Sequence, residues 1–360
     1  MPSLYEQFLS YNPDSSEYRF LVTLSLSVLV LFGLSLLFAV IAMSLRLHNF
    51  RQEKLWQNLY QLWNRDMLEV LSGDTSPTEF RKLVAPHQEL NFIRFLAPYV
   101  WRLRGSDLNT LSSLGLPYLP HVVNMLQHRE IGVRLWAVNI ISQFGMPQYE
   151  ATILKAFQDE SPVVAMFAAN ALLRLGHARY VVPVLDQFHR FDKWGINSMA
   201  TLLSSVGHEA IPLLRQIYLD PVREPRTRVV AAEVLNRFCD YGVADDAAAL
   251  LDSTGRLDLL IATLRLLSTV GQEKHRAAVH PLCSSSNDAI RVNAVRTLRQ
   301  LCIADDLPLF IAALDDSSPW VARQAARALK LLGDTATLER MSSGQHPRAM
   351  LASQILAGKD

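Results

Sequence analysis

The most constraining feature of the sequence is a pattern that recurs through its C-terminal two-thirds. Glycines that follow leucine-rich segments stand 31 residues apart at Gly145, Gly176 and Gly207. Gly271 and Gly333 are separated by twice that interval, and the segment "VRTLRQLC" ends midway between them. A chain with this period cannot close around one central core, because each copy must bury its apolar face against its neighbours. We therefore expect an elongated stack of similar units.

Each unit is predicted to be a helix, a tight turn and a second helix. In "SSPWVARQAARALKLLGD" (317–334), Pro319 suits the first helical turn and Gly333 suits the left-handed residue that ends a helix. Val321, Ala325 and Leu329 recur every four residues, which places them on one apolar face. A second apolar helix follows each closing turn, and prolines lie near the start of several: Pro183, Pro212, Pro281 and Pro308.

Small residues recur in register with these closing positions. The alanines that stand eight residues before a closing position are Ala137, Ala168, Ala294 and Ala325, and Ala231 and Ala262 lie close to the same register. A buried alanine lets neighbouring helices approach closely, so we expect these positions at contacts between units. Between Gly207 and Gly271 the spacing is less regular, and "VVAAEVLNRFCDYG" (229–242) supplies the helix of a middle unit.

The pattern resembles the short HEAT repeats known from phycobilisome lyases and bacterial scaffold proteins. The resemblance is carried by "HREIGVRLWAVNIISQFG" (128–145), "ESPVVAMFAANALLRLG" (160–176), "NDAIRVNAVRTLRQLC" (287–302) and "SSPWVARQAARALKLLG" (317–333). It covers residues 128–356, in seven units of which the last is a partial cap. It implies an all-α fold, an α-solenoid that winds HEAT-like repeats into a superhelix. The register between residues 191 and 255 stays open.

An uncharged apolar segment covers residues 20–45. At ~1.5 Å rise per residue, a helix of this length crosses the ~30 Å hydrocarbon core of a bilayer. A cleaved signal peptide has a basic start and a shorter apolar core, whereas Glu6, Asp14 and Glu17 precede this segment. We therefore expect a retained single-pass transmembrane helix ahead of the solenoid.

Basic residues flank this segment asymmetrically. Arg46, Arg51 and Lys54 follow it directly, while Arg19 alone precedes it. The positive-inside rule then places the N-terminus outside and the solenoid in the cytoplasm, at the cell (inner) membrane. The expected parts are a short extracytoplasmic tail at 1–19, the transmembrane helix at 20–45, a juxtamembrane helix at 46–75, N-terminal capping helices at 76–127 and the HEAT-like repeats at 128–360.

The juxtamembrane segment 55–71 carries an aromatic stripe that has two interpretations. Trp56, Tyr60 and Trp63 recur at helical spacing on one face. A helix lying on the bilayer interface suits Trp and Tyr, but such helices usually carry many bases on their polar face. The polar face here is acidic. We therefore favour a helix packed as a cap of the solenoid, or paired with its copy in a dimer.

No pattern in the sequence points to a reaction, a metal or a cofactor. Deoxyhypusine hydroxylases, which share this repeat type, hold two irons through several His-Glu pairs, whereas His208–Glu209 is the single such dipeptide here. Cys239, Cys283 and Cys302 are too far apart for a metal site. The 35 Lys and Arg residues balance 34 Asp and Glu residues, which argues against a nucleic-acid binder. We expect no enzymatic activity, no cofactor and no small-molecule substrate.

Three arginines and one tryptophan are candidate partner-binding residues. Arg134 and Arg291 lie eleven residues before the closing positions of their repeats, and Arg323 lies ten before. Equivalent positions of a superhelix form a ladder along one surface. These arginines, with Trp320 beside them, either line a groove for an acidic partner or bond an acidic residue or helix end of the adjoining repeat.

The sequence as a whole predicts a membrane-anchored cytoplasmic scaffold that binds a protein partner. We expect the partner to be membrane-associated, for example an envelope-glycan glycosyltransferase. One alternative is an enzyme with an unrecognised site in the groove, of the HEAT-like lyase or hydroxylase type. The other is a purely structural membrane tether.

Overall fold

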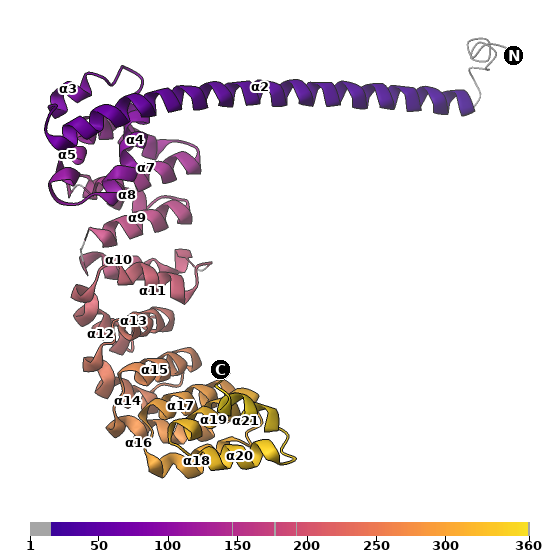
Figure 1. Ribbon diagram of the computed structural model, residues 1–360, viewed down its shortest axis with the longest axis vertical. Helices are drawn as coiled ribbons and strands as arrows, with labels where there is room; N and C mark the ends of the chain where they lie inside the picture. The colour runs from indigo at the N-terminus through magenta and orange to yellow at the C-terminus, as the bar shows by residue number, and fades with distance from the viewer. Residues whose placement is uncertain (1–15, 146, 176–177, 192, 359–360) are drawn as a thin grey trace. The chain divides into compact units, whose positions relative to one another are not determined.

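The computed structural model describes residues 16–145, 147–175, 178–191 and 193–358. Within these ranges all secondary structure is helical, as α-helices and short 3-10 helices, so the prediction of an all-α fold is confirmed. The chain divides into two compact units, Met1–Leu119 and Pro120–Asp360. Both units contain buried apolar residues, and Figure 1 draws their helices.

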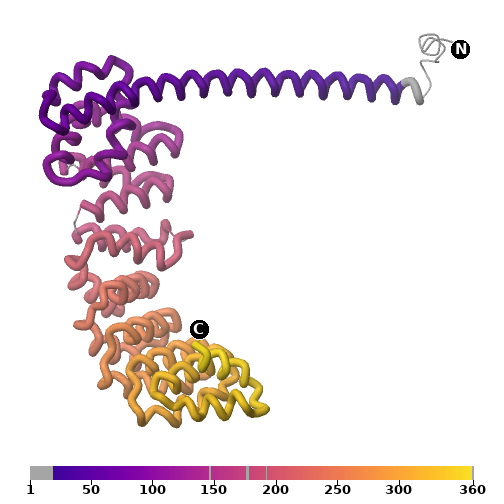
Figure 2. Tube along the Cα trace, in the orientation of Figure 1, coloured from indigo at the N-terminus to yellow at the C-terminus, as the bar shows by residue number. Residues whose placement is uncertain are grey.

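The first unit begins with one long helix, α2 (Ser16–Ser72), of 57 residues. Separate helices are expected at 20–45 and 46–75, but a continuous helix runs through that boundary (Figure 2). The reason is local: no glycine or proline occurs between residues 46 and 72, so nothing interrupts the backbone ladder. Most of the expected external tail, residues 1–15, lies outside the described residues.

The N-terminal part of α2 is apolar and uncovered. All side chains from residue 19 to residue 55 are exposed in the structure. By length and composition, this helix is long and apolar enough to cross a membrane.

The C-terminal end of α2 packs within the first unit against shorter helices. These are α3 (Pro77–Arg81), α4 (Glu89–Arg102) and α5 (Gly105–Gly115), followed by the 3-10 helix η1 (Leu116–Tyr118). Trp63 is completely buried, with its ring centroid 5.3 Å from that of Phe92 and 5.6 Å from that of Phe95. Met67 and Val70 continue the buried stripe. This end of the 55–71 segment therefore packs inside the first unit, while Tyr60 stays exposed.

The second unit is a stack of helix pairs that follows α6 (Leu119–Asn124) and η2 (Met125–Gln127). In the part of the unit that the structure describes there are seven pairs and one final helix. The first helices of the pairs are α7 (Ile131–Phe144), α9 (Pro162–Arg174), α11 (Ile196–Ser204), α13 (Pro225–Arg237), α15 (Leu257–Val270), α17 (Asp288–Leu301) and α19 (Pro319–Leu331). The second helices are α8 (Glu150–Phe157), α10 (Val181–Asp186), α12 (Ile211–Leu219), α14 (Ala244–Ser253), α16 (Arg276–Val279), α18 (Leu307–Ala313) and α20 (Thr335–Ser343). The final helix is α21 (Ala349–Leu356).

First helices pack on first helices, which makes the unit a solenoid. Contacts run from α11 through α13, α15 and α17 to α19, and from α7 to α9. Short 3-10 helices precede most of the second helices, in the order η3 (Pro147–Tyr149), η4 (Ala178–Tyr180), η6 (His208–Ala210), η7 (Tyr241–Val243), η8 (Glu273–His275) and η10 (Ala304–Asp306). Two more follow second helices, η5 (Phe188–Phe191) and η9 (His280–Ser284). Pro212 and Pro308 occupy the second position of α12 and α18, where a missing N–H costs nothing.

The closing glycines work as predicted in three repeats. Gly145, Gly207 and Gly333 have φ of 60°, 86° and 85°, in the left-handed region that favours glycine. Gly271 has an ordinary φ of −67°, and Gly176 lies outside the described residues.

The first helix of the middle unit, α13, ends earlier than the sequence indicates. The segment 229–242 reads as one helix, but α13 ends at Arg237 and Gly242 lies in η7. Cys239 takes the left-handed conformation instead, with φ of 50°. The glycine was therefore the wrong signal for the end of this helix.

The register of the alanines holds in five repeats and fails in one. Ala137, Ala168, Ala231, Ala294 and Ala325 are all completely buried. In α15 the position belongs to Thr263 rather than to Ala262, which is only half-buried. The Thr263 hydroxyl lies 2.8 Å from the Tyr218 hydroxyl and donates to the Leu259 carbonyl, so this polar side chain is satisfied inside the core.

Candidate functional site

Arg134 is held inside the first repeat of the solenoid. Its side chain, only 7% exposed, projects from α7 to Asp159, which follows α8. Nε donates to Asp159 Oδ2 at 2.8 Å and Nη2 donates to Oδ1 at 3.0 Å, a bidentate pair. Nη1 donates to the carbonyl of His128 at 2.9 Å. All three nitrogens of the guanidinium are engaged within the protein.

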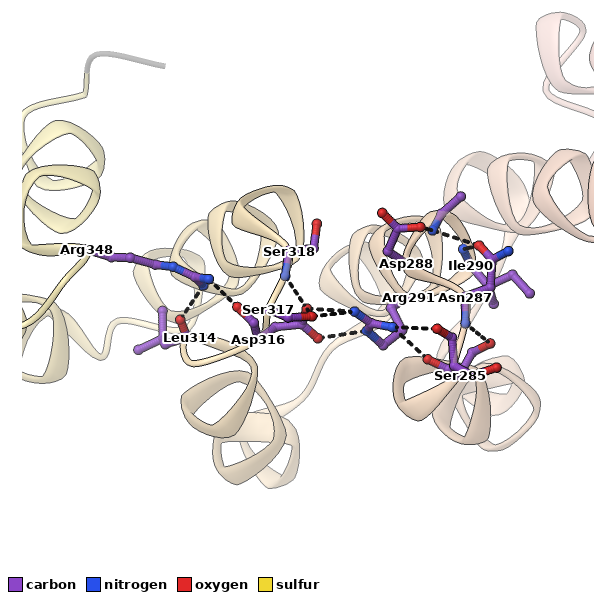
Figure 3. Close-up of polar contacts among 12 residues, drawn as sticks. Ser285, Asn287, Asp288, Ile290, Arg291, Leu314, Asp316, Ser317, Ser318 and Arg348 are labelled. Carbon is purple, nitrogen blue, oxygen red and sulfur yellow. Dashed lines mark hydrogen bonds and ion pairs between the residues drawn. The ribbon is translucent and has the colours of Figure 1, made fainter.

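Arg291 repeats this arrangement near the other end of the unit (Figure 3). Nε and Nη2 donate to Asp316 Oδ2 and Oδ1 at 2.8 and 2.9 Å, and Nη1 donates to the Ser285 carbonyl at 2.9 Å. Asp316 Oδ1 also accepts the backbone N–H of Ser318, the N-cap residue of α19, at 2.7 Å. We call each bidentate pair, Arg134–Asp159 and Arg291–Asp316, an arginine clamp.

A second arginine, from the following repeat, bonds the turn that holds each clamp aspartate. Nη1 of Arg348 donates to the Leu314 carbonyl at 2.7 Å, and Nη2 donates to the Asp316 carbonyl (Figure 3). Arg190 bonds the carbonyls of Phe157 and Asp159 in the same way. Each clamp therefore ties the turn after one pair of helices to the pairs on both sides.

Pairing in the clamps shifts the pKa values of Asp316, Arg291 and Arg134. The hydrogen bond from Arg291 lowers the pKa of the Asp316 carboxyl, and that same bond raises the pKa of Arg291. The bond to Asp159 likewise raises the pKa of Arg134. The contacts of Arg134 and Arg291 are thus those of the second interpretation, arginines that bond an acidic residue of the adjoining repeat.

Arg323 and Trp320 lie in a different environment. Ala322, not Arg323, occupies the clamp position of α19, because Arg323 is one residue later in register. The Arg323 side chain is half-buried, and its Nε has no hydrogen-bond partner among the described residues. Trp320 is 63% exposed. These two side chains remain available for contact with a partner.

The structure also shows a second arginine series, exposed or half-buried, that the sequence analysis missed. Arg265, Arg296 and Arg327 stand 31 residues apart, at the same position of α15, α17 and α19. Arg323 lies one helical turn before Arg327. We call these four residues the arginine row. Their spacing equals the repeat period, so the signal was present in the sequence, but period alone does not separate exposed from buried arginines.

The arginines of the row differ in their exposure and contacts. Arg265 is exposed, and its Nε lies 3.5 Å from Asn293 Oδ1. Arg296 is exposed and makes no hydrogen bond or ion pair with another described residue. Arg327 is half-buried.

A shallow depression lies beside the N-terminal end of the row. It has a volume of about 340 Å³ and is formed by α13, α15 and the start of α11. Val229, Ile261 and Ala262 supply its apolar lining, while Glu233 and Arg265 supply charge. The depression offers an apolar contact next to the first arginine of the row.

The structure gives no support to nucleophilic chemistry at the two half-buried cysteines, Cys283 and Cys302. Burial raises the pKa of the Cys283 thiol to about 12 and also raises that of Cys302, so both thiols stay protonated near neutral pH. His208 and Glu209 are exposed in η6. Among the residues described, no three His, Cys, Asp or Glu side chains are grouped so that they could hold a metal ion.

Comparison with known protein families finds a match to two segments of the chain. A family model described as HEAT repeats matches residues 119–201 and 249–330. These two segments are similar to HEAT repeats. The unmatched interval between them contains α12 and α13, where the closing signals depart most from the pattern.

Three solved structures match this chain at low sequence identity and low TM-score. The complex of CpcE and CpcF of phycocyanin lyase from Nostoc sp. PCC7120 is 18% identical with a TM-score of 0.30, covering 67% of this chain and 88% of that one. Human deoxyhypusine hydroxylase in complex with glycerol is 18% identical with a TM-score of 0.27, covering 70% and 98%. Kap121p is 14% identical with a TM-score of 0.37, covering 84% of this chain and 42% of that one. A comparison with curated proteins found no significant match.

Proposed function

We propose that this chain is a single-pass membrane protein whose HEAT-repeat solenoid lies in the cytoplasm and binds a protein partner. The observation that carries the proposal is the contrast between two apolar helices. In α9 the apolar residues Val164, Ala168 and Leu172 are completely buried in the solenoid. In α2 the apolar segment 20–45 is exposed throughout, although it is longer. A bilayer would cover this apolar surface. Exposing it to water would cost a large amount of free energy.

The charges around α2 support the orientation. Arg46, Arg51 and Lys54 lie on exposed turns of the helix directly after the apolar segment. Bases close to the end of a span are retained on the cytoplasmic side. The solenoid follows these residues and therefore shares their side of the membrane.

The partner in this proposal is itself a membrane protein. A solenoid held at the membrane meets other membrane-bound proteins at a raised effective concentration, whereas a freely soluble target gains less from the anchor. An envelope-glycan glycosyltransferase with cytoplasmic domains is an example of this class. The solenoid acts by positioning such a protein rather than by catalysis.

Topology is tested with reporter fusions after Asp360. We expect a reporter that is active only in the cytoplasm to work, and one that is active only outside it to stay silent. The opposite pattern contradicts both the orientation and the cytoplasmic scaffold.

The partner is tested by crosslinking in intact membranes, with the full chain and with a chain that ends after α2. Recovery of a membrane protein by the full chain alone supports the scaffold. Equal recovery by both chains favours the purely structural tether. Recovery of soluble proteins only contradicts the membrane-bound class of partner.

A further inference from the structure

We propose that the arginine row is the docking surface for an acidic segment of the protein partner. This inference rests on the scaffold function proposed above and assigns it a site and a chemistry. The occupant is a chain segment with carboxylates at regular intervals.

The row places its charges at a regular spacing. Helices α15, α17 and α19 pack in sequence, and the axes of packed helices lie ~8–10 Å apart. Arg265, Arg296 and Arg327 occupy the same position on these three helices, so their Cα atoms advance by about one helix spacing per repeat. Arg323 adds a second charge on α19, one turn from Arg327.

Two members of the row, Arg296 and Arg323, pair with no carboxylate of the described residues. The sequence of α19, "PWVARQAARALKL", contains no acidic residue, and the single acid of α17 is Asp288 at its first position. Arg296 has no partner among the described residues. In contrast, the clamp arginines each hold a carboxylate at hydrogen-bonding distance. Guanidiniums at the surface that lack an internal carboxylate can accept one from outside.

Helix α19 also carries buried polar atoms that lack hydrogen-bond partners among the described residues. Nε of Arg323 and Oε1 of Gln324 are both buried without a hydrogen-bond partner in the described part of the chain. Trp320, Arg323 and Arg327 stand at i, i+3 and i+7, which places them on one stripe of the helix. An exposed indole, an unpaired guanidinium and a second arginine therefore face one occupant together.

The spacing matches a polypeptide. An extended chain advances ~3.3–3.6 Å per residue, so every third side chain falls ~10 Å further along. Glutamates at every third position would therefore meet successive arginines of the row. Each guanidinium can hold a carboxylate with two parallel hydrogen bonds.

The surroundings of the row disfavour a continuous polyanion. In α13 the position equivalent to Arg265 belongs to Glu233, which pairs with Arg237 at 3.5 Å. Asp258 lines the depression at the same end. A nucleic acid or an anionic bilayer presents unbroken negative charge and would meet these carboxylates, whereas a short acidic segment ends before them.

The test uses the full chain in detergent micelles and a fluorescein-labelled peptide of twelve residues with glutamate at every third position. Binding is followed by fluorescence anisotropy. We expect the double variant Arg296→Glu/Arg323→Glu to weaken binding by about tenfold, because two attractions become repulsions. The single variant Arg296→Glu removes no internal contact and should show a smaller loss in the same direction. A peptide with glutamine in place of glutamate should bind weakly to every protein.

The matched control is Arg65→Glu/Arg129→Glu, which reverses two exposed arginines outside the row. Equal loss with the control, or no loss with either double variant, overturns the proposal. Tighter binding of phosphatidylglycerol vesicles or of a single-stranded oligonucleotide than of the peptide overturns it as well. The full chain with Arg296→Glu/Arg323→Glu is also crosslinked in intact membranes. If it still recovers the membrane protein, the scaffold function is supported and this docking site is contradicted. If no protein crosslinks through the solenoid, the scaffold function itself fails.

Discussion

Two copies of one repeat lie near opposite ends of the solenoid, at residues 128–161 and 285–318. Their buried contacts are the same, but their exposed residues differ. Both contain an arginine clamp, with Nε to carboxylate distances of 2.8 Å in each. In both, the clamp aspartate also accepts the backbone N–H two residues later. On the exposed side, however, α7 has Asn139 where α17 has Arg296.

This difference separates the residues that build the repeat from those that distinguish its copies. A buried clamp or alanine must be kept, because an unpaired buried charge or a poorly filled interface costs stability. The exposed position eight residues into the helix bears no such constraint. A row of arginines can therefore arise in the last repeats without altering the stack.

The largest effect is expected where the two regions are most alike. Ala168→Leu in the second repeat and Ala325→Leu in the seventh both overpack a completely buried position. Each should lower the free energy of unfolding by ~1–3 kcal/mol. Thermal or chemical unfolding of the full chain measures the loss. Ala262→Leu is the control, because Ala262 is only half-buried, and an equal loss there contradicts the observed register.

A smaller loss is expected when a clamp is opened. Asp316→Ala removes the two bonds from Arg291 and the bond from Ser318 N–H, and it should cost ~1–2 kcal/mol of unfolding free energy. Asp159→Ala should destabilise in the same direction. Glu160→Ala is the control, because this side chain is 87% exposed and makes one bond to Arg134. If Asp316→Ala leaves the free energy of unfolding unchanged while Asp159→Ala lowers it, the two clamps are not equivalent.

The smallest effect on stability is expected from making the first repeats resemble the last. Asn139→Arg and Asn170→Arg place arginines at the positions equivalent to Arg296 and Arg327. Both positions are at least partly exposed, so the free energy of unfolding should change by less than ~0.5 kcal/mol. The same unfolding measurement applies. A large loss would show that this position is constrained by packing after all.

Much of the fold follows from local and periodic features. The 31-residue period, the apolar faces and the closing glycines specify helix pairs that must stack, and the family match agrees with them. The apolar segment 20–45 is visible by composition alone. The end of α13 was not predictable from the sequence. The left-handed conformation after this helix is adopted by Cys239, whereas glycine is the residue expected at such a position.

The sequence by itself determined that arginines recur with the repeats, but only the tertiary structure decided what each one does. Arg291 and Arg323 differ by one residue in register, which turns a helical side chain by about 100°. That rotation takes Arg291 into the contact with Asp316 and leaves Arg323 without a described partner. The clamp aspartate lies in a turn that the next pair of helices positions. Since that position depends on packing between repeats, no local pattern in the sequence could separate the clamps from the arginine row.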